Sequence, residues 1–202
     1  IVGAGLAGCA TACALVEQGW RSTLFDRADA PALQGSGNLA GLFHGIVNPQ
    51  DGAHARFNRA AALLAQRTVQ QAIDCGVARG SAQGLLRLDT RGIGVQAMRA
   101  ELAALHLPSD YVQALDAAQA SACCGLPLRH PAWLYHGGGW VQPAALARWF
   151  LQQAGPAARF SGNLNVQSLR TEGGRWQLHG AAGEFIAEAG TVVLANAADA
   201  LR

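Results

Sequence analysis

The chain has no lysine: all 15 of its basic residues are arginine, set against 13 acidic residues for a formal net charge of +2 over 202 residues. A charge so close to balance excludes the strong basic field of proteins that hold nucleic acids by charge alone. The arginines are scattered from Arg21 to Arg202 and form no cluster. We therefore interpret the missing lysine as a bias of composition and not as a phosphate-binding surface.

Cysteine is scarce and forms no recognisable pattern. The five cysteines include no C-x-x-C pair, and an odd number fits no closed set of disulfides. They are Cys9, Cys13, Cys75, Cys123 and Cys124. With no histidine near the first two, buried thiols are favoured over a metal site.

Long apolar runs are also absent. No stretch approaches the roughly 20 apolar residues that span a bilayer, and no charged segment precedes the apolar start as in a signal peptide. The sequence therefore predicts a cytoplasmic, reducing location with neither a membrane nor a metal.

Glycine, by contrast, is abundant and is patterned at the start of the chain. The opening IVGAGLAG places Gly3, Gly5 and Gly8 in the spacing G-x-G-x-x-G. A helix is expected over Cys9–Gln18, followed by a short strand over Ser22–Phe25. This order predicts a βαβ unit that binds a dinucleotide.

An acidic residue completes the pattern. Asp26 follows the second strand, 18 residues beyond Gly8, where a carboxylate can accept hydrogen bonds from ribose hydroxyls. The glycine turn lets the backbone approach a pyrophosphate, and the helix N-terminus offers N–H groups to it. Arg27 would suit the 2′-phosphate of NADP, so these residues alone leave the choice of dinucleotide open.

The rest of the chain reads as an interrupted α/β domain. Residues 34–52 form a long glycine- and asparagine-rich loop, whose apolar residues favour a functional segment over a disordered one. Helices are then expected over 56–74, 95–107, 116–123 and 143–153, with strands over 84–90, 131–136, 166–170, 176–179, 185–187 and 191–194. With boundaries placed near the glycines at 76–80 and 137–139, residues 1–76 and 138–202 are predicted to form the dinucleotide-binding domain. Residues 77–137 would then be part of an α+β substrate domain.

Four stretches in this order resemble one known family. IVGAGLAG, LFDRADAPALQGSGNLAG, GGGWVQPAALARW and VVLANAADA are similar to motifs of the FAD-dependent D-amino-acid/glycine oxidase superfamily. The likeness is greatest to the oxidoreductase half of the bifunctional bacterial enzymes that make methylaminomethyl-uridine at the tRNA wobble position. The motif order holds over all 202 residues, and residues 77–131 match only loosely.

The resemblance implies a Rossmann-like FAD-binding domain of the glycine oxidase type, truncated here, with an upstream methyltransferase domain in the parent protein. It also implies a set of positions along the cofactor, from the pyrophosphate and ribose to the flavin. These are Gly3, Gly5, Ala7, Gly8, Asp26, Arg27, Ser36, Gly37, Asn38, Gly41, Val166, Ala195, Asn196 and Ala197. The fragment alone is expected to be inactive.

The implied reaction is oxidation of a secondary amine on tRNA. The carbon next to nitrogen loses a hydride to the flavin, and hydrolysis of the imine removes the carboxymethyl group from carboxymethylaminomethyl-uridine. No catalytic residue is identified, and His44 near the expected flavin is either a flavin-tuning or a structural residue. A small-molecule amine oxidase for glycine, sarcosine or a D-amino acid is the first alternative, and an NAD(P)-binding module is the second.

Overall fold

The structure, a computed structural model, describes residues 1–201. The chain divides into two compact units. The first unit contains Ile1–Leu39 and the segment that begins at Gln142, and the second contains Ala40–Val141.

The first unit is built on a parallel sheet. Strand β1 (Ser22–Phe25) pairs in parallel with β8 (Ala158–Ser161). Val2 forms parallel bridges to both Phe25 and Leu194. The order across the sheet is therefore 193–195, 1–3, β1 and β8, which is the strand order of a doubly wound, Rossmann-like domain. The predicted fold class is confirmed.

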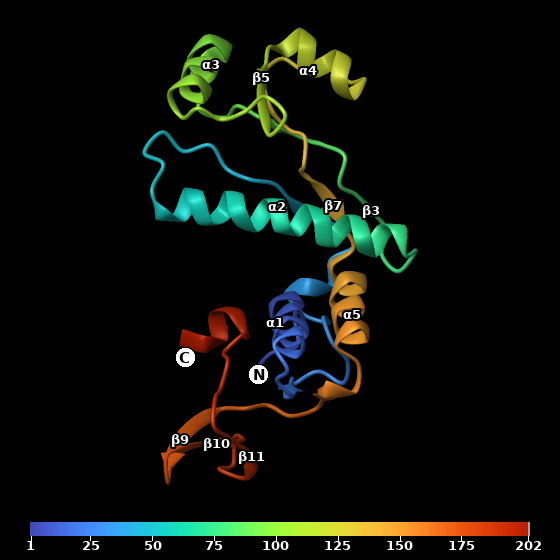
Figure 1. The fold of residues 1–202 in the computed structure, drawn as a ribbon, viewed down its shortest axis with the longest axis vertical. Coiled ribbons are helices and arrows are strands. Elements are labelled where there is room, and N and C mark those ends of the chain that lie inside the picture. The colour runs from blue at the N-terminus through green and yellow to red at the C-terminus, as the bar shows by residue number, and fades with distance from the viewer. Residues whose placement is uncertain (202) are drawn as a thin grey trace. The chain divides into compact units, whose positions relative to one another are not determined.

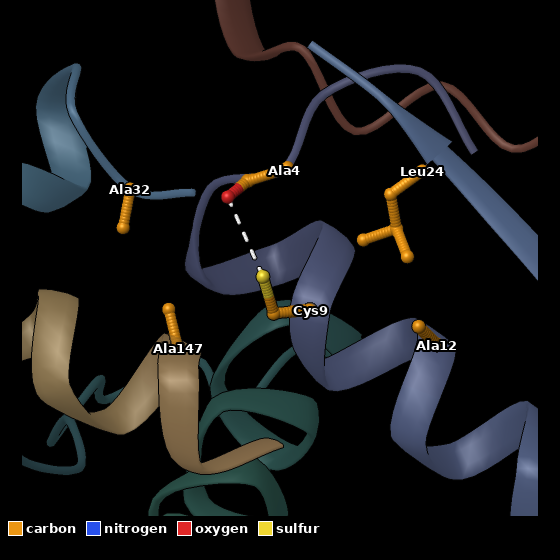
Figure 2. Packing of buried hydrophobic residues seen from close by; sticks show 6 residues of the cluster. All are labelled: Ala4, Cys9, Ala12, Leu24, Ala32 and Ala147. Atoms are coloured by element: carbon orange, nitrogen blue, oxygen red, sulfur yellow. Dashed lines mark hydrogen bonds between the residues drawn. The ribbon is translucent and has the colours of Figure 1, made fainter. Parts of the chain in front are cut away.

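Two helices pack together beside this sheet. Helices α1 (Leu6–Glu17) and α5 (Pro143–Ala154) lie side by side (Figure 1). Their contact is made of small side chains, with Cys9 of α1 and Ala147 of α5 both completely buried (Figure 2). Small residues let two helices approach closely and still leave the packing dense.

A three-stranded antiparallel meander follows β8 in the first unit. It consists of β9 (Ser168–Glu172), β10 (Arg175–His179) and β11 (Phe185–Ala189), with β10 in the centre. Gly173 and Gly174 join β9 to β10 with φ values of +56° and +77°, as a two-residue hairpin turn requires. The predicted hairpin is confirmed, although β9 begins two residues later than expected. Short 3₁₀ helices also occur in this unit: η1 (Gly35–Gly37), η2 (Gly155–Ala157) and η3 (Ala197–Leu201).

The second unit contains one long helix and two small antiparallel sheets. Helix α2 spans Ala53–Asp74. In one sheet β7 (Gly139–Val141) lies between β2 (Gly41–Phe43) and β3 (Gly80–Ser81). In the other, β6 (Ala132–Tyr135) lies between β4 (Leu85–Leu88) and β5 (Val112–Leu115). Helices α3 (Gly94–Ala104) and α4 (Ala117–Cys124) complete the unit, and Asp116 closes the start of α4 with a capping box.

Several elements differ from the prediction. Strands β5 and β8 were not predicted, because each has only four residues, which is too short for a periodic pattern to stand out. Residues 139–141, at the predicted domain boundary, form strand β7, and residues 41–43 of the predicted loop form β2. Strands β2 and β3 both pair with β7, and the chain divides into its two units between residues 39 and 40 and between residues 141 and 142. The domain boundaries at 76 and 137 stay a prediction.

No helix within residues 1–201 is both long and apolar enough to cross a membrane.

Candidate functional site

The glycine turn at the start of the chain is packed so closely that two of its glycines cannot be replaced without movement. Gly3 has a φ of +98°, and a Cβ there would lie 2.7 Å from the carbonyl oxygen of Ala195. A Cβ on Gly8 would overlap the carbonyl oxygen of Gly3. The turn is therefore held between the start of α1 and the segment 193–196, as expected of a dinucleotide-binding turn.

The N-terminus of α1 presents free amides beside this turn. The amide of Leu6 donates to Ser36 Oγ at 2.9 Å, and the amide of Cys9 makes the first helical bond, to Gly5 O at 3.0 Å. Within residues 1–201 the amides of Gly5, Ala7 and Gly8 have no hydrogen-bond acceptor. Unpaired amides at the positive end of a helix form an anion site suited to a pyrophosphate.

Asp26 is an anchor of the turn. Its Oδ2 accepts a hydrogen bond from the amide of Ala4 at 2.7 Å, and its Oδ1 accepts one from the amide of Ala28 at 2.9 Å. Each carboxylate oxygen can accept a second hydrogen bond, so the predicted ribose contact remains open to it. The sequence predicted a ligand contact here, but it gave no sign of this structural role.

Both terminal nitrogens of the Arg27 guanidinium contact other side chains of the protein. Its Nη1 lies 3.2 Å from Asp199 Oδ2, and its Nη2 donates to Gln34 Oε1 at 3.3 Å. The charge that a 2′-phosphate of NADP would need is thus directed to a carboxylate. The pair also ties η3 to the end of β1.

The segment after residue 193 contributes an unsatisfied polar atom. The amide of Ala195 donates to Val2 O at 2.8 Å, which holds the segment against the first strand. Asn196 follows, and its Oδ1 is buried with no hydrogen-bond partner among the described residues. A buried amide oxygen without a donor calls for a ligand or water to supply one.

The remaining predicted positions lie in three places. Gly37 and Asn38 belong to the turn η1 and the residue after it, where Asn38 Nδ2 donates to Gly35 O at 3.2 Å. Val166 lies between β8 and β9, and its backbone makes no hydrogen bond to another described residue. Ala197 begins η3, whereas Gly41 begins β2 in the second unit.

Residues that the sequence did not single out support the turn. The amide of Ala32 donates to Ala4 O at 3.0 Å, and Ala32 is buried with a positive φ of +61°. Cys9 Sγ lies 3.4 Å from the same carbonyl (Figure 2). Burial, with a smaller effect of the Asp26 charge, raises the pKa of the Cys9 thiol to about 12. This cysteine is therefore a packing residue and not a reactive thiol.

The residues present fit a dinucleotide with a pyrophosphate. The fit rests on unpaired amides at a helix N-terminus, on positions 3 and 8 that only glycine fits, and on the unpartnered Asn196 oxygen. In residues 1–201 no three His, Cys, Asp or Glu side chains gather in a manner that could hold a metal. The fold and this site define a Rossmann-like, dinucleotide-binding domain.

Comparison with known proteins gives the family. Residues 1–201 match the family model described as "DAO: FAD dependent oxidoreductase", so the chain belongs to the family of FAD-dependent oxidoreductases of the DAO type. FAD is the cofactor of that family.

Two curated relatives and two solved structures are similar to the chain. The tRNA 5-methylaminomethyl-2-thiouridine biosynthesis bifunctional protein MnmC of Methylibium petroleiphilum is 44% identical over 196 residues, covering 97% of this chain and 30% of that protein. The protein of the same name from Paraburkholderia xenovorans is 34% identical over 204 residues, covering 100% and 31%. Glycine oxidase from Geobacillus kaustophilus superposes with a TM-score of 0.72 at 20% identity, covering 96% of this chain and 53% of that one. L-proline dehydrogenase from P. horikoshii has a TM-score of 0.69 at 16% identity, covering 99% and 53%.

The structural likenesses concern the fold, because both identities are low. The chain spans about 30% of the length of the curated relatives that it matches.

Proposed function

We propose that the chain is the flavin-binding part of an enzyme that removes the carboxymethyl group from carboxymethylaminomethyl-(2-thio)uridine at the tRNA wobble position. The observation that carries the proposal is the similarity to the tRNA-modifying MnmC proteins over nearly the whole chain. The glycine turn and its unpaired amides support the cofactor part of the proposal.

The residues of this chain would act by holding the cofactor. The amides of Gly5, Ala7 and Gly8 would donate to the pyrophosphate, and Asp26 would hold both the turn and a ribose hydroxyl. Val166 would contact the adenine through its free backbone groups, with Ser36, Gly37, Asn38 and Gly41 along the cofactor and Ala195, Asn196 and Ala197 closing over it. Bound FAD supplies a two-electron acceptor for a C–H bond next to an amine nitrogen.

The chemistry at the substrate follows from that acceptor. Loss of a hydride from the carbon beside the secondary amine leaves an imine on the substrate, and water then releases glyoxylate and aminomethyl-uridine. A methyltransferase domain in the same protein, tRNA as the partner and a cytoplasmic location belong to the same proposal.

The competing substrate class is a free small amine such as glycine or sarcosine. The alternative of an NAD(P)-binding module does not agree with the match to an FAD-dependent family.

The test compares the two substrates on the product of the complete reading frame. Turnover is measured with tRNA that carries carboxymethylaminomethyl-uridine and with free sarcosine and glycine, following glyoxylate and the modified nucleoside by mass spectrometry. We expect tRNA to be turned over with a kcat/KM far above that of either free amine. Equal or faster turnover of a free amine would contradict the tRNA assignment and leave the flavin assignment intact.

A further inference from the structure

The second unit contains a hollow, and none of the residues that line it is among the predicted cofactor positions. It has a volume of about 210 Å³ and lies among the loop at residues 47–49, strand β4 with the residues that follow it, and strand β6. Its polar lining consists of Asn48, Arg87, Asp89, Thr90 and Arg91, and its aromatic lining of Trp133 and Tyr135. At about 30 Å³ for each liquid water molecule, this is far more room than a single water needs.

The pairing of β4 with β6 places the Arg87 side chain on the same face of the sheet as two aromatic side chains. Arg87 lies directly opposite Trp133 in the antiparallel register, and Leu85 lies opposite Tyr135, so all four side chains share one face of the sheet. Trp133 and Tyr135 are buried on that face beside Met98 of α3. Arg87 is exposed, so it presents its guanidinium at the open part of the same face.

The other two charged side chains of the lining, Arg91 and Asp89, have partners within the protein, and they lie 3.7 Å from each other. Arg91 makes a bidentate pair with Glu101, at 3.1 and 2.9 Å, and its guanidinium lies 5.8 Å from the centroid of the Trp133 ring. Asp89 is buried, and its carboxylate accepts hydrogen bonds from the amides of Arg91 and Ile93. Within the described chain no carboxylate lies within ion-pair distance of Arg87. Arg87 is therefore the charged side chain of the lining that has no ion-pair partner among the described residues.

Neutral polar side chains line the same hollow as this arginine. Asn48 Oδ1 already accepts from the amide of Gln50 at 2.9 Å, which leaves the Asn48 amino group as a donor. The Tyr135 hydroxyl oxygen accepts hydrogen bonds from the Arg87 side chain and from the backbone amide of Val47. Burial raises the pKa of Tyr135 despite the opposing effect of Arg87, so the hydroxyl keeps its proton. An arginine fork with neutral donors is the arrangement that binds the oxygens of an anion.

We propose that this hollow is an oxyanion site that takes a phosphate group, with Arg87 as its charged ligand. A stacked base is a poor fit, because Trp133 is only 5% exposed and Arg91 covers its ring. The phosphate can come from an RNA backbone or from a free phosphate compound, and the RNA source alone rests on the proposed function.

The first arm of the test titrates inorganic phosphate into the product of the complete reading frame at constant ionic strength, by calorimetry. Three variants are compared with the parent: Arg87→Gln, Arg87→Lys and the control Arg129→Gln, which removes an exposed arginine elsewhere in the same unit. We expect saturable binding by the parent and by the control, binding weakened about tenfold or more by R87Q, and partial retention by R87K. Absence of saturable binding, or equal binding by R87Q and R129Q, would overturn the site.

The second arm identifies the source of the phosphate. Binding of a short single-stranded RNA is measured against salt concentration for the same variants. If RNA supplies the phosphate, R87Q lowers the slope of log K against log salt by about 0.7, and R129Q leaves it unchanged. An unchanged slope in R87Q, with phosphate binding lost, would assign the site to a free phosphate compound.

Two measurements keep these outcomes separate from other failures. Far-UV circular dichroism and the unfolding midpoint establish that the variants fold. Should R87Q unfold, R87K against Arg129→Lys gives the same comparison with the charge retained, because lysine lacks the fork. A protein that binds phosphate through Arg87 and does not oxidise tRNA would refute the proposed function and leave the oxyanion site standing.

Discussion

The two units would recognise phosphate with different atoms. In the first unit the donors are backbone amides at the start of α1, fixed by Gly3, Gly8 and Asp26. In the second unit the donors are side chains, with Arg87 as the charged one beside the buried rings of Trp133 and Tyr135. A backbone site depends on a local turn and on glycine spacing. A side-chain site depends on strand register, which joins residues about 45 positions apart.

The largest expected effect would test whether the two units are stabilised separately. Replacing Trp133 with alanine removes a buried ring from the core of the second unit and should cost about 3–5 kcal/mol of stability. Hydrogen exchange should show lost protection in β4, β5 and β6, with α1 and β1 much less affected. Trp176→Ala is the control, since Trp176 is 38% exposed on β10. An equal loss in both variants would contradict the core role of Trp133.

A smaller effect is expected at the glycine turn of the first unit. Gly8→Ala pushes a methyl group into the carbonyl of Gly3, which should cost about 1–3 kcal/mol and displace the free amides. Both the unfolding midpoint and the amount of FAD retained on purification should fall. Gly52→Ala adds a methyl group in open space and serves as the control. If G8A retains FAD as well as G52A, the amides of the turn are not the cofactor site.

A third variant tests the backbone site by replacing Asp26, which holds the glycine turn. Asp26→Asn keeps one acceptor for the amides of Ala4 and Ala28 and loses the other, with an expected cost of about 1–2 kcal/mol even when no FAD is bound. Asp29→Asn, at a nearby exposed carboxylate, is the matched control. The measurement is the unfolding midpoint of the cofactor-free protein. An effect seen only in the presence of FAD would show that Asp26 binds ribose and does not hold the turn.

The smallest expected change concerns the thiol beneath the turn. Cys9 should resist alkylation at pH 8 in the folded protein, whereas the exposed Cys75, Cys123 and Cys124 react. Because its pKa is raised from about 9 to about 12 on folding, the protein should lose stability as the pH rises through that interval, when the unfolded thiol ionises first. Cys9→Ala should flatten this part of the stability profile. Alkylation of Cys9 as fast as that of Cys75 would refute its burial.

The glycine turn of the first unit was predicted better than the elements of the second unit. The turn can be recognised from the sequence because its conformation requires glycine, and the motif therefore appears as a fixed spacing of Gly3, Gly5, Gly8 and Asp26. The anchoring role of Asp26 could not be predicted, because it depends on where the amide of Ala4 points after folding.

The elements of the second unit were predicted less well, because they too depend on contacts that form only on folding. Four-residue strands such as β5 carry too little periodicity to be distinguished from loops, and their partners lie far along the chain. Without the β4–β6 register, Arg87 is one scattered arginine among 15. The hollow therefore appears only in the folded chain.

The most direct test of the central claim is the identity of the bound cofactor. The product of the complete reading frame is purified and denatured, and the released small molecules are examined by absorption spectroscopy and mass spectrometry. We expect a yellow supernatant that contains FAD at close to one molecule per chain, and much less from the Gly8→Ala variant. A colourless supernatant, or one that contains NADP in place of a flavin, would contradict the claim that the glycine turn holds FAD.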